Sequence, residues 1–142
     1  MCQVRVEVRA LVFQDERVAV NEERRHGIPR LSLPGGRVER WETLEQALVR
    51  EVNEELGVEV ECGEFICAFQ VLKRFHIQDL NVVFEAALKD PDAASNLRFV
   101  DPAETGSTIF PPILEQLGQR NRSGRAGLWL GNVWRDELRA SV

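Results

Sequence analysis

The sequence has little of what points to a secreted, zinc-binding or membrane-spanning protein. Its three cysteines are odd in number and form no C-x-x-C pair, and it has only two histidines. The sequence therefore spells out neither a disulfide framework nor a zinc site, and reduced structural thiols are the plain interpretation. It has no run of about 20 apolar residues that would cross a bilayer, and its N-terminus lacks the apolar core of a secretory signal. These absences predict a cytoplasmic protein without a membrane partner.

Net charge and chain length further limit the kinds of ligand and the number of domains to expect. The formal net charge is −5, which argues against broad, nonspecific binding to nucleic acid or anionic membranes. An anionic small molecule still fits if a metal ion bridges it to the protein. The chain has 142 residues and 44% apolar content, enough to bury a core without disulfides or structural metal. We therefore expect one globular domain over residues 1–142.

Alternating apolar residues indicate strands on both sides of one central helix. Residues 4–13 (VRVEVRALVF) show the period-two pattern of a half-buried strand, and residues 18–20 predict its hairpin partner. Residues 21–30 are polar and predict a loop, whereas residues 31–39 predict a strand broken by a proline and two glycines. The same reasoning predicts one bent or two separate strands over 58–75, strands over 79–88, 97–100 and 128–134, a loop over 89–96 and a helix over 111–119.

The central helix is the best-bounded element. Thr43 and Gln46 have the spacing of a capping box, and Gly57 stands where a helix commonly ends in the left-handed conformation. The sequence therefore predicts a helix over about residues 44–56. With strands before and after it, the pattern favours a mixed sheet with helices on its faces.

The end of this helix is crowded with carboxylates. At about 100° per residue, Glu51, Glu54 and Glu55 share an arc of roughly 100°. Glu51 and Glu55 are in line with the apolar Leu44 and Leu48 of earlier turns. The last turn of a helix carries partial negative charge and favours cations rather than carboxylates. A bound cation would explain the cluster, although a solvated acidic face is the alternative because like-charge pairs cost only about 0.2–0.5 kcal/mol each.

A longer pattern surrounds the carboxylates. Residues 36–58 (GRVERWETLEQALVREVNEELGV) satisfy G-x5-E-x7-R-E-U-x-E-E-x-G-U, where U is aliphatic. This segment resembles the box of the Nudix hydrolases, and a chance match has a frequency below about 10⁻⁸ per start position. The resemblance implies an α/β (α+β) fold, a Nudix-type α/β/α sandwich with a mixed β-sheet.

The resemblance also implies a divalent metal site and a reaction. The metal ligands would be the carboxylates of Glu51, Glu54 and Glu55 and the backbone carbonyl of Gly35, a set of hard oxygens that suits Mg²⁺ or Mn²⁺. Arg50 would orient its neighbours by pairing with a carboxylate. Metal-activated water would attack a phosphorus of a nucleoside diphosphate linked to another moiety.

The general base and the substrate contacts are left open by the sequence. Glu54 within the box and Glu85 outside it are candidate bases, with Asp101 and Glu104 as further candidates, and Glu85 could equally be an outward strand residue. Phosphates are commonly held by arginine or lysine. The predicted substrate-binding residues are Arg24, Arg25 and Arg74, with Lys73, Phe75 and His76 as weaker candidates.

Several alternatives stay open. ADP-ribose-like compounds and nucleoside triphosphates are equally compatible substrates, and a nucleotide-binding regulatory domain or an ion-buffering domain are the alternatives to an enzyme. The apolar strand with Trp129 and Trp134 could form a homodimer interface. Trp41 stands where the family often has glycine, so the turn must differ or be strained. We expect the Trp41 ring to pack over the loop rather than to stack on a base.

Overall fold

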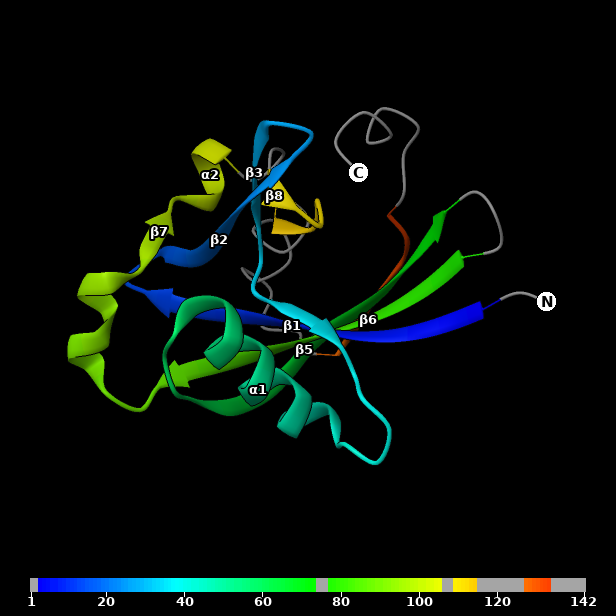
Figure 1. Ribbon diagram of the computed structural model, residues 1–142, viewed down its shortest axis with the longest axis horizontal. Helices are drawn as coiled ribbons and strands as arrows, with labels where there is room; N and C mark the ends of the chain where they lie inside the picture. Colours follow the sequence, from blue (N-terminus) through cyan, green and yellow to red (C-terminus); the bar gives the residue numbers. More distant parts are fainter. Residues whose placement is uncertain (1–2, 74–76, 106–108, 115–126, 134–142) are drawn as a thin grey trace.

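The computed structural model describes residues 3–73, 77–105, 109–114 and 127–133. Its strands are β1 (Gln3–Gln14), β2 (Arg17–Arg25), β3 (Ile28–Ser32), β4 (Gly35–Arg37), β5 (Val60–Lys73), β6 (Ile77–Leu88), β7 (Arg98–Val100), β8 (Ile109–Phe110) and β9 (Leu128–Asn132). Within the described residues these nine strands form one sheet in the order β8-β3-β2-β1-β6-β5-β9, with β4 added beside β1 and β7 beside β2 (Figure 1). The sheet is mixed, as predicted, because β1–β6, β3–β8 and β5–β9 pair in parallel and the other pairs are antiparallel.

The central helix forms as predicted and is α1 (Leu44–Leu56). The Thr43 hydroxyl accepts a hydrogen bond from the Gln46 backbone N at 3.1 Å, and the Gln46 side chain accepts one from the Thr43 backbone N at 3.0 Å. At the other end Gly57 has φ 69° and its N–H donates to the Asn53 carbonyl at 2.9 Å. Each terminus of the helix thus has a capping hydrogen bond.

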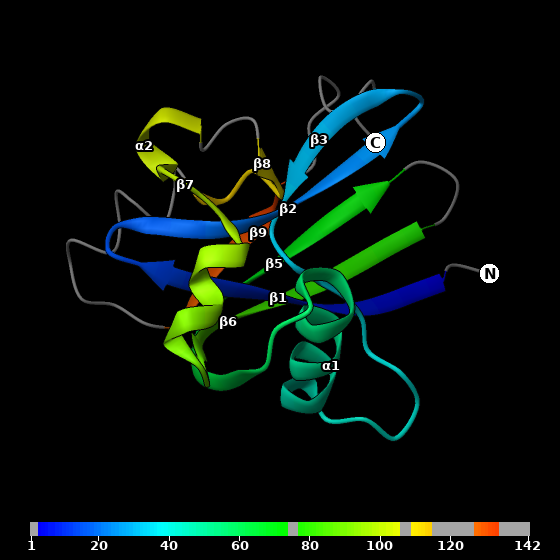
Figure 2. The same ribbon diagram turned by 60° about the vertical axis from the view of Figure 1, so that its left-hand side comes forward.

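The core lies on both faces of the sheet. Figures 1 and 2 show α1 lying across one face, where its buried residues Ala47, Leu48 and Val52 pack on β1, β5 and β6. The next residue along a strand points to the opposite face. Leu11 and Val83 therefore face the second core cluster, which continues with Val18, Val20, Leu33, Phe69, Ile109 and Ile113. Two short helices, η1 (Pro91–Asn96) and α2 (Pro102–Thr105), flank β7.

The prediction of a loop over residues 21–30 was wrong. Strand β2 continues to Arg25, and β3 begins at Ile28 and pairs with it in antiparallel register (Figure 2). Both turn residues have positive φ, with His26 at 49° and Gly27 at 79°, which is the backbone of a hairpin turn that follows the twist of its strands. The segment is rich in polar residues, so its strands could not be recognised from composition alone.

The other differences are local. Residues 58–75 contain one long strand, β5, whose register shifts on both sides of Phe65, and the predicted loop over 89–96 contains the single helix η1. The predicted helix over 111–119 starts as a turn, and its part after Leu114 lies outside the described residues. The predicted final strand is present as β9, which ends at Asn132. Across the described residues, no helix is long and apolar enough to span a membrane.

Candidate metal-binding active site

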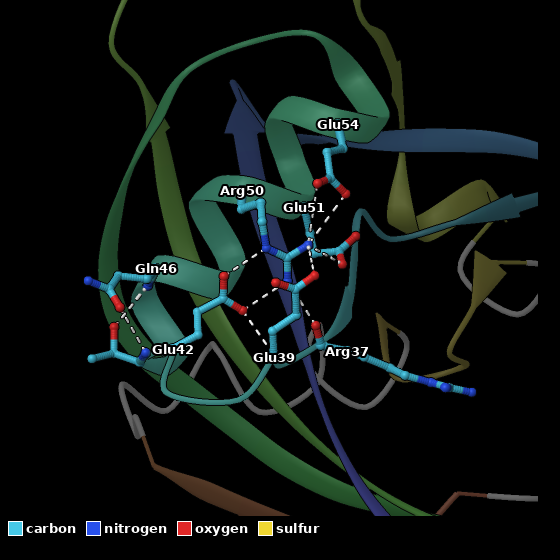
Figure 3. A network of polar contacts seen from close by, with 8 residues as sticks. Arg37, Glu39, Glu42, Gln46, Arg50, Glu51 and Glu54 are labelled. Carbon is cyan, nitrogen blue, oxygen red and sulfur yellow. Dashed lines mark hydrogen bonds and ion pairs between the residues drawn. The ribbon is translucent and has the colours of Figure 1, made fainter.

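Arg50 lies at the centre of the site and ties the loop before α1 to the helix (Figure 3). Its Nε and Nη2 donate to the two carboxylate oxygens of Glu42 at 2.7 and 2.9 Å, and Nη2 also donates to the Arg37 carbonyl at 3.0 Å. These hydrogen bonds from Arg50 hold the pKa of Glu42 down at about 2, and Glu42 in turn raises the pKa of Arg50. Arg50 thus pairs with a carboxylate, and its role in orienting its neighbours stays a prediction.

The same guanidinium faces two of the helix carboxylates. Arg50 Nη1 donates to Glu51 Oε1 at 2.8 Å and lies 3.4 Å from Glu54 Oε2, and Figure 3 shows both carboxylates turned toward it. Carboxylates that repel each other gather around the nearest cation. The part of the chain that the structure describes holds no three acidic, histidine or cysteine side chains already placed as metal ligands. A divalent ion bound by Glu51 and Glu54 would compete with Arg50 for these carboxylates.

Glu55 points instead toward β2 and β4. Its Oε2 accepts hydrogen bonds from the Gly35 backbone N at 3.2 Å and from Asn21 Nδ2 at 3.3 Å. Burial is the main cause that raises the pKa of Glu55 to about 7, and the charges of Glu51 and Glu23 add to it. The Gly35 hydrogen bond and the charge of Arg9 act in the opposite direction. A cation beside Glu55 would favour its ionised form.

The two glycines of β4 allow two close approaches, that of β1 at Gly35 and that of the Glu51 carboxylate at Gly36. Gly35 has φ 152°, and a Cβ built there would come within 2.0 Å of the Val8 carbonyl oxygen. A Cβ on Gly36 would lie 2.6 Å from the carboxylate carbon of Glu51. The backbone of β4 and the carboxylates of Glu51 and Glu55 thus bring oxygen atoms that can ligate a metal ion to one surface. Such a set fits Mg²⁺ or Mn²⁺, and Glu51, Glu54, Glu55 and the carbonyl of Gly35 could hold the ion.

Several predicted residues are not brought to this surface. Glu85 is exposed, and because its neighbours Phe84 and Ala86 pack on the α1 side, its side chain lies on the opposite face of the sheet. Arg24 is exposed and points to the face of β2 opposite Asn21. The Arg25 side chain and Arg74 lie outside the described residues. Asp101 accepts a hydrogen bond from the Ala103 backbone N at 2.8 Å, at the start of α2.

Trp41 adopts the strained turn that the sequence allowed. Its φ is 67°, a conformation that costs a residue with a Cβ roughly 1–2 kcal/mol. The prediction that its ring packs over the loop was wrong, because the residue is 93% exposed.

The sequence analysis missed the polar residues that β1, β2 and β3 bring to the site. Asn21 contacts Glu55, and Arg9 donates through Nη1 to the Leu33 carbonyl at 3.1 Å. Arg30 pairs with Glu23 at 3.3 Å. These contacts are made by the pairing of strands that are distant in sequence, so no local sequence motif predicts them. The alternation along β1 does place Arg9 on the face opposite Val8, the one signal that the sequence offered.

A helix whose Glu51 and Glu55 lie against the two glycines of β4, on a mixed sheet, fits one class of protein, the Nudix hydrolase domain. The chain belongs to the Nudix family, because the family model described as NUDIX domain matches residues 3–120. A CTP pyrophosphohydrolase of Escherichia coli (strain K12) is 38% identical over 60 residues. That match covers 37% of this chain and 44% of the relative, so it spans less than half of the relative's length.

Solved structures show the same fold. A NUDIX hydrolase from Nitrosomonas europaea is similar with a TM-score of 0.71 and 22% identity, covering 88% of this chain and 93% of that chain. An ADP-ribose pyrophosphatase from Streptococcus suis 89-1591 is similar with a TM-score of 0.60 and 18% identity, covering 88% and 98%. These likenesses confirm the predicted α/β/α sandwich with a mixed sheet.

Proposed function

We propose that this chain is a divalent-metal-dependent pyrophosphohydrolase that cleaves a nucleoside diphosphate linked to another moiety. The observation that supports this most is the placement of Glu51 and Glu55 of α1 against the glycine backbone of β4. Carboxylate and carbonyl oxygens at one surface are the ligands that Mg²⁺ and Mn²⁺ take when they bind phosphates. We propose Mg²⁺ or Mn²⁺ as the cofactor, without a preference between them.

The bound ion would neutralise phosphate charge and acidify a water molecule. Residues of this chain would hold the metal-binding carboxylates in position. Arg50 holds the loop through Glu42 and keeps Glu51 in place, and Glu55 is kept in place by Gly35 and Asn21. Glu54, whose side chain is 58% exposed, is the better-placed proton acceptor for an attacking water, since Glu85 lies on the other face of the sheet.

Two substrate classes are proposed side by side. The Escherichia coli relative is named for CTP, a nucleoside triphosphate, and the Streptococcus suis neighbour is named for ADP-ribose. Both compounds contain a nucleoside joined to a diphosphate, and water attack on either gives two products that end in phosphate. We therefore propose small nucleotide substrates as a class.

The single-domain organisation over residues 1–142 and the homodimer stay proposals. Trp129 on β9 is 55% exposed, and Trp134 lies outside the described residues. Light scattering tests the dimer directly: a mass of twice 16.2 kDa supports it, and a monomeric mass removes it.

Phosphate release tests the proposed activity. A coupled phosphatase would report turnover of nucleoside triphosphates, ADP-ribose, nucleotide sugars and dinucleoside polyphosphates with Mg²⁺ or Mn²⁺. We expect ion-dependent turnover that falls on the order of 100-fold in Glu55→Gln. Glu45→Gln is the matched control, since Glu45 is exposed in the first turn of the same helix.

Either result of that assay is informative. Ion-dependent turnover that survives in Glu45→Gln and collapses in Glu55→Gln supports the proposal and identifies the substrate class. No turnover across the panel, in protein that still binds Mn²⁺, would replace the enzyme with a nucleotide-binding regulatory domain.

A further inference from the structure

The face of β2 and β3 next to Glu55 carries a row of polar side chains that the proposed chemistry has not used. Asn21 pairs in register with Ser32, and Glu23 pairs with Arg30. Residues two apart on a strand point to the same face, so Glu23 and Arg30 lie on the face where Asn21 contacts Glu55. At about 3.3 Å per residue, they follow the Asn21–Ser32 pair by roughly 7 Å.

Arg30 is nearly buried and lies against an aromatic ring. Its side chain is 12% exposed, and its guanidinium carbon lies 4.8 Å from the ring centroid of Phe110. Its Nη2 lies 3.3 Å from Glu23 Oε2, and the Glu23 side chain is 39% exposed. Glu23 can therefore turn to water, while stacking on Phe110 keeps the guanidinium in place.

Arg9 places a second positive charge near the Phe110 ring. Its guanidinium carbon lies 5.8 Å from the Phe110 centroid, and its charge reaches Glu55, where it lowers the pKa. Arg9 is fixed by hydrogen bonds to Glu7 at 2.9 Å, to Asn81 at 3.3 Å and to the Leu33 carbonyl. Arg9 and Arg30 thus bring two positive charges close to the Phe110 ring, and Glu23, one partner of Arg30, is partly open to solvent.

Ser32 gives an independent sign that this face binds something. Its side chain is buried, with the residue 1% exposed, yet its Oγ has no hydrogen-bond partner among the described residues. A buried hydroxyl without a partner is rare and needs an explanation. Ser32 stands in register between Asn21 on β2 and Phe110 on β8, so its hydroxyl lies between the carboxylate end of the row and the aromatic end.

We infer that Arg30 binds the diphosphate of the substrate, with Arg9 and Phe110 as its support, on the side of the site that faces the carboxylates of α1. The inference rests on the proposed function and assigns the phosphate contact within it. A guanidinium matches two phosphate oxygens through parallel hydrogen bonds. A diphosphate held on one side by Arg30 and on the other by an ion on Glu55 would have its negative charge balanced from both sides. In binding, the diphosphate takes the place of Glu23 as the partner of Arg30.

Methylenediphosphonate is the probe, because its P–C–P bridge keeps the charge of a diphosphate and cannot be hydrolysed. Its binding is measured by calorimetry at saturating Mn²⁺, in parallel with steady-state kinetics on any substrate found active. We expect Arg30→Gln to bind the probe about 10- to 100-fold more weakly, as for the loss of a charged hydrogen bond. KM should rise by a similar factor while kcat changes less than about threefold. Arg30→Lys should recover part of the affinity.

Two further variants serve as controls, one expected to leave probe binding unchanged and one expected to strengthen it. Arg98→Gln removes an arginine that pairs with Glu22 of β2 at 2.6 Å, the same kind of pair on another face of the same strand, and should leave probe binding unchanged. Glu23→Gln removes the competing carboxylate and should bind the probe more tightly, by about two- to fivefold.

The inference is overturned if folded Arg30→Gln binds methylenediphosphonate like the native chain, or if Arg98→Gln weakens binding equally. It is also overturned if the native chain does not bind the probe with Mn²⁺ present. The binding assay needs no turnover, so failure of the proposed hydrolysis is seen separately. Arg30-dependent binding without hydrolysis would retain the phosphate contact and remove the enzyme.

Discussion

Replacement of Arg50 by alanine should destabilise the protein far more than loss of an ordinary surface arginine. Arg50 makes two hydrogen bonds to Glu42, one to Glu51 and one to the Arg37 carbonyl, and its side chain is 24% exposed. A charged hydrogen bond contributes about 1.5–3 kcal/mol, and contributions within one network do not add. The variant also leaves Glu42, 14% exposed, without its counter-charge. We expect a loss of about 3 kcal/mol in the free energy of unfolding, close to the cost of breaking a buried ion pair.

Urea and thermal unfolding measure this loss. For a domain of this size, about 3 kcal/mol corresponds to a fall in Tm of roughly 6–12 °C. Arg98→Ala is the matched control, because its pair with Glu22 is exposed and should contribute only about 0–1 kcal/mol. Arg50→Lys keeps the charge but not the paired hydrogen bonds, so it should recover only part of the stability. A loss below about 1 kcal/mol in Arg50→Ala would refute the reasoning that Arg50 fastens the loop to α1.

Three further predictions concern single positions. Gly36→Ala should lower kcat and leave the fold nearly unchanged, since the new Cβ would displace the Glu51 carboxylate. In the control Gly57→Ala the new Cβ meets no atom within 4 Å, so this variant should keep its kcat and lose only about 1 kcal/mol of unfolding free energy through its φ of 69°. Equal kcat in the two variants would contradict this prediction. The depressed pKa of Glu42 means that its contribution is complete above about pH 4.5 and is lost as the pH falls through about 2, so urea unfolding of the native chain and Glu42→Gln should converge over that range. Glu85→Gln should keep kcat within about twofold, and a loss of 100-fold or more, as expected for a general base, would return Glu85 to that role.

The sequence predicted the elements whose signals are local. Helix α1 was delimited by Thr43, Gln46 and Gly57, and the structure shows the same capping box and left-handed C-cap. The spacing of Glu51, Glu54 and Glu55 put three carboxylates on one face, because helical geometry fixes that relation without any tertiary contact. Strand β1 was visible from its alternation.

Features made by long-range contacts were not predicted. The end of β2 and most of β3 lie in the polar segment 21–30, whose composition predicts a loop, and the turn is His26–Gly27 rather than the commoner Asn-Gly or Asp-Gly. The register of β2 and β3 puts Arg30 on the face that Asn21 shares, whereas Arg24, the arginine predicted from the sequence, points to the other face. Composition cannot distinguish the two, since both are charged residues of one short segment.

The different partners of the three helix carboxylates could not be predicted from the sequence either. The box pattern treats Glu51, Glu54 and Glu55 alike, but Arg50 attracts the first two while Gly35 and Asn21 hold the third. That difference depends on the position of β4 beside the helix and on the low exposure of Glu55. It makes Glu55 the residue whose removal should reveal metal binding most clearly.

Mn²⁺ binding to the native chain, Glu55→Gln and Glu45→Gln, followed by electron paramagnetic resonance of the free ion, tests the central claim most directly. We predict that the native chain and Glu45→Gln bind Mn²⁺ alike, and that Glu55→Gln binds at least about tenfold more weakly. Equal binding by all three proteins would contradict a metal site formed by α1 and β4.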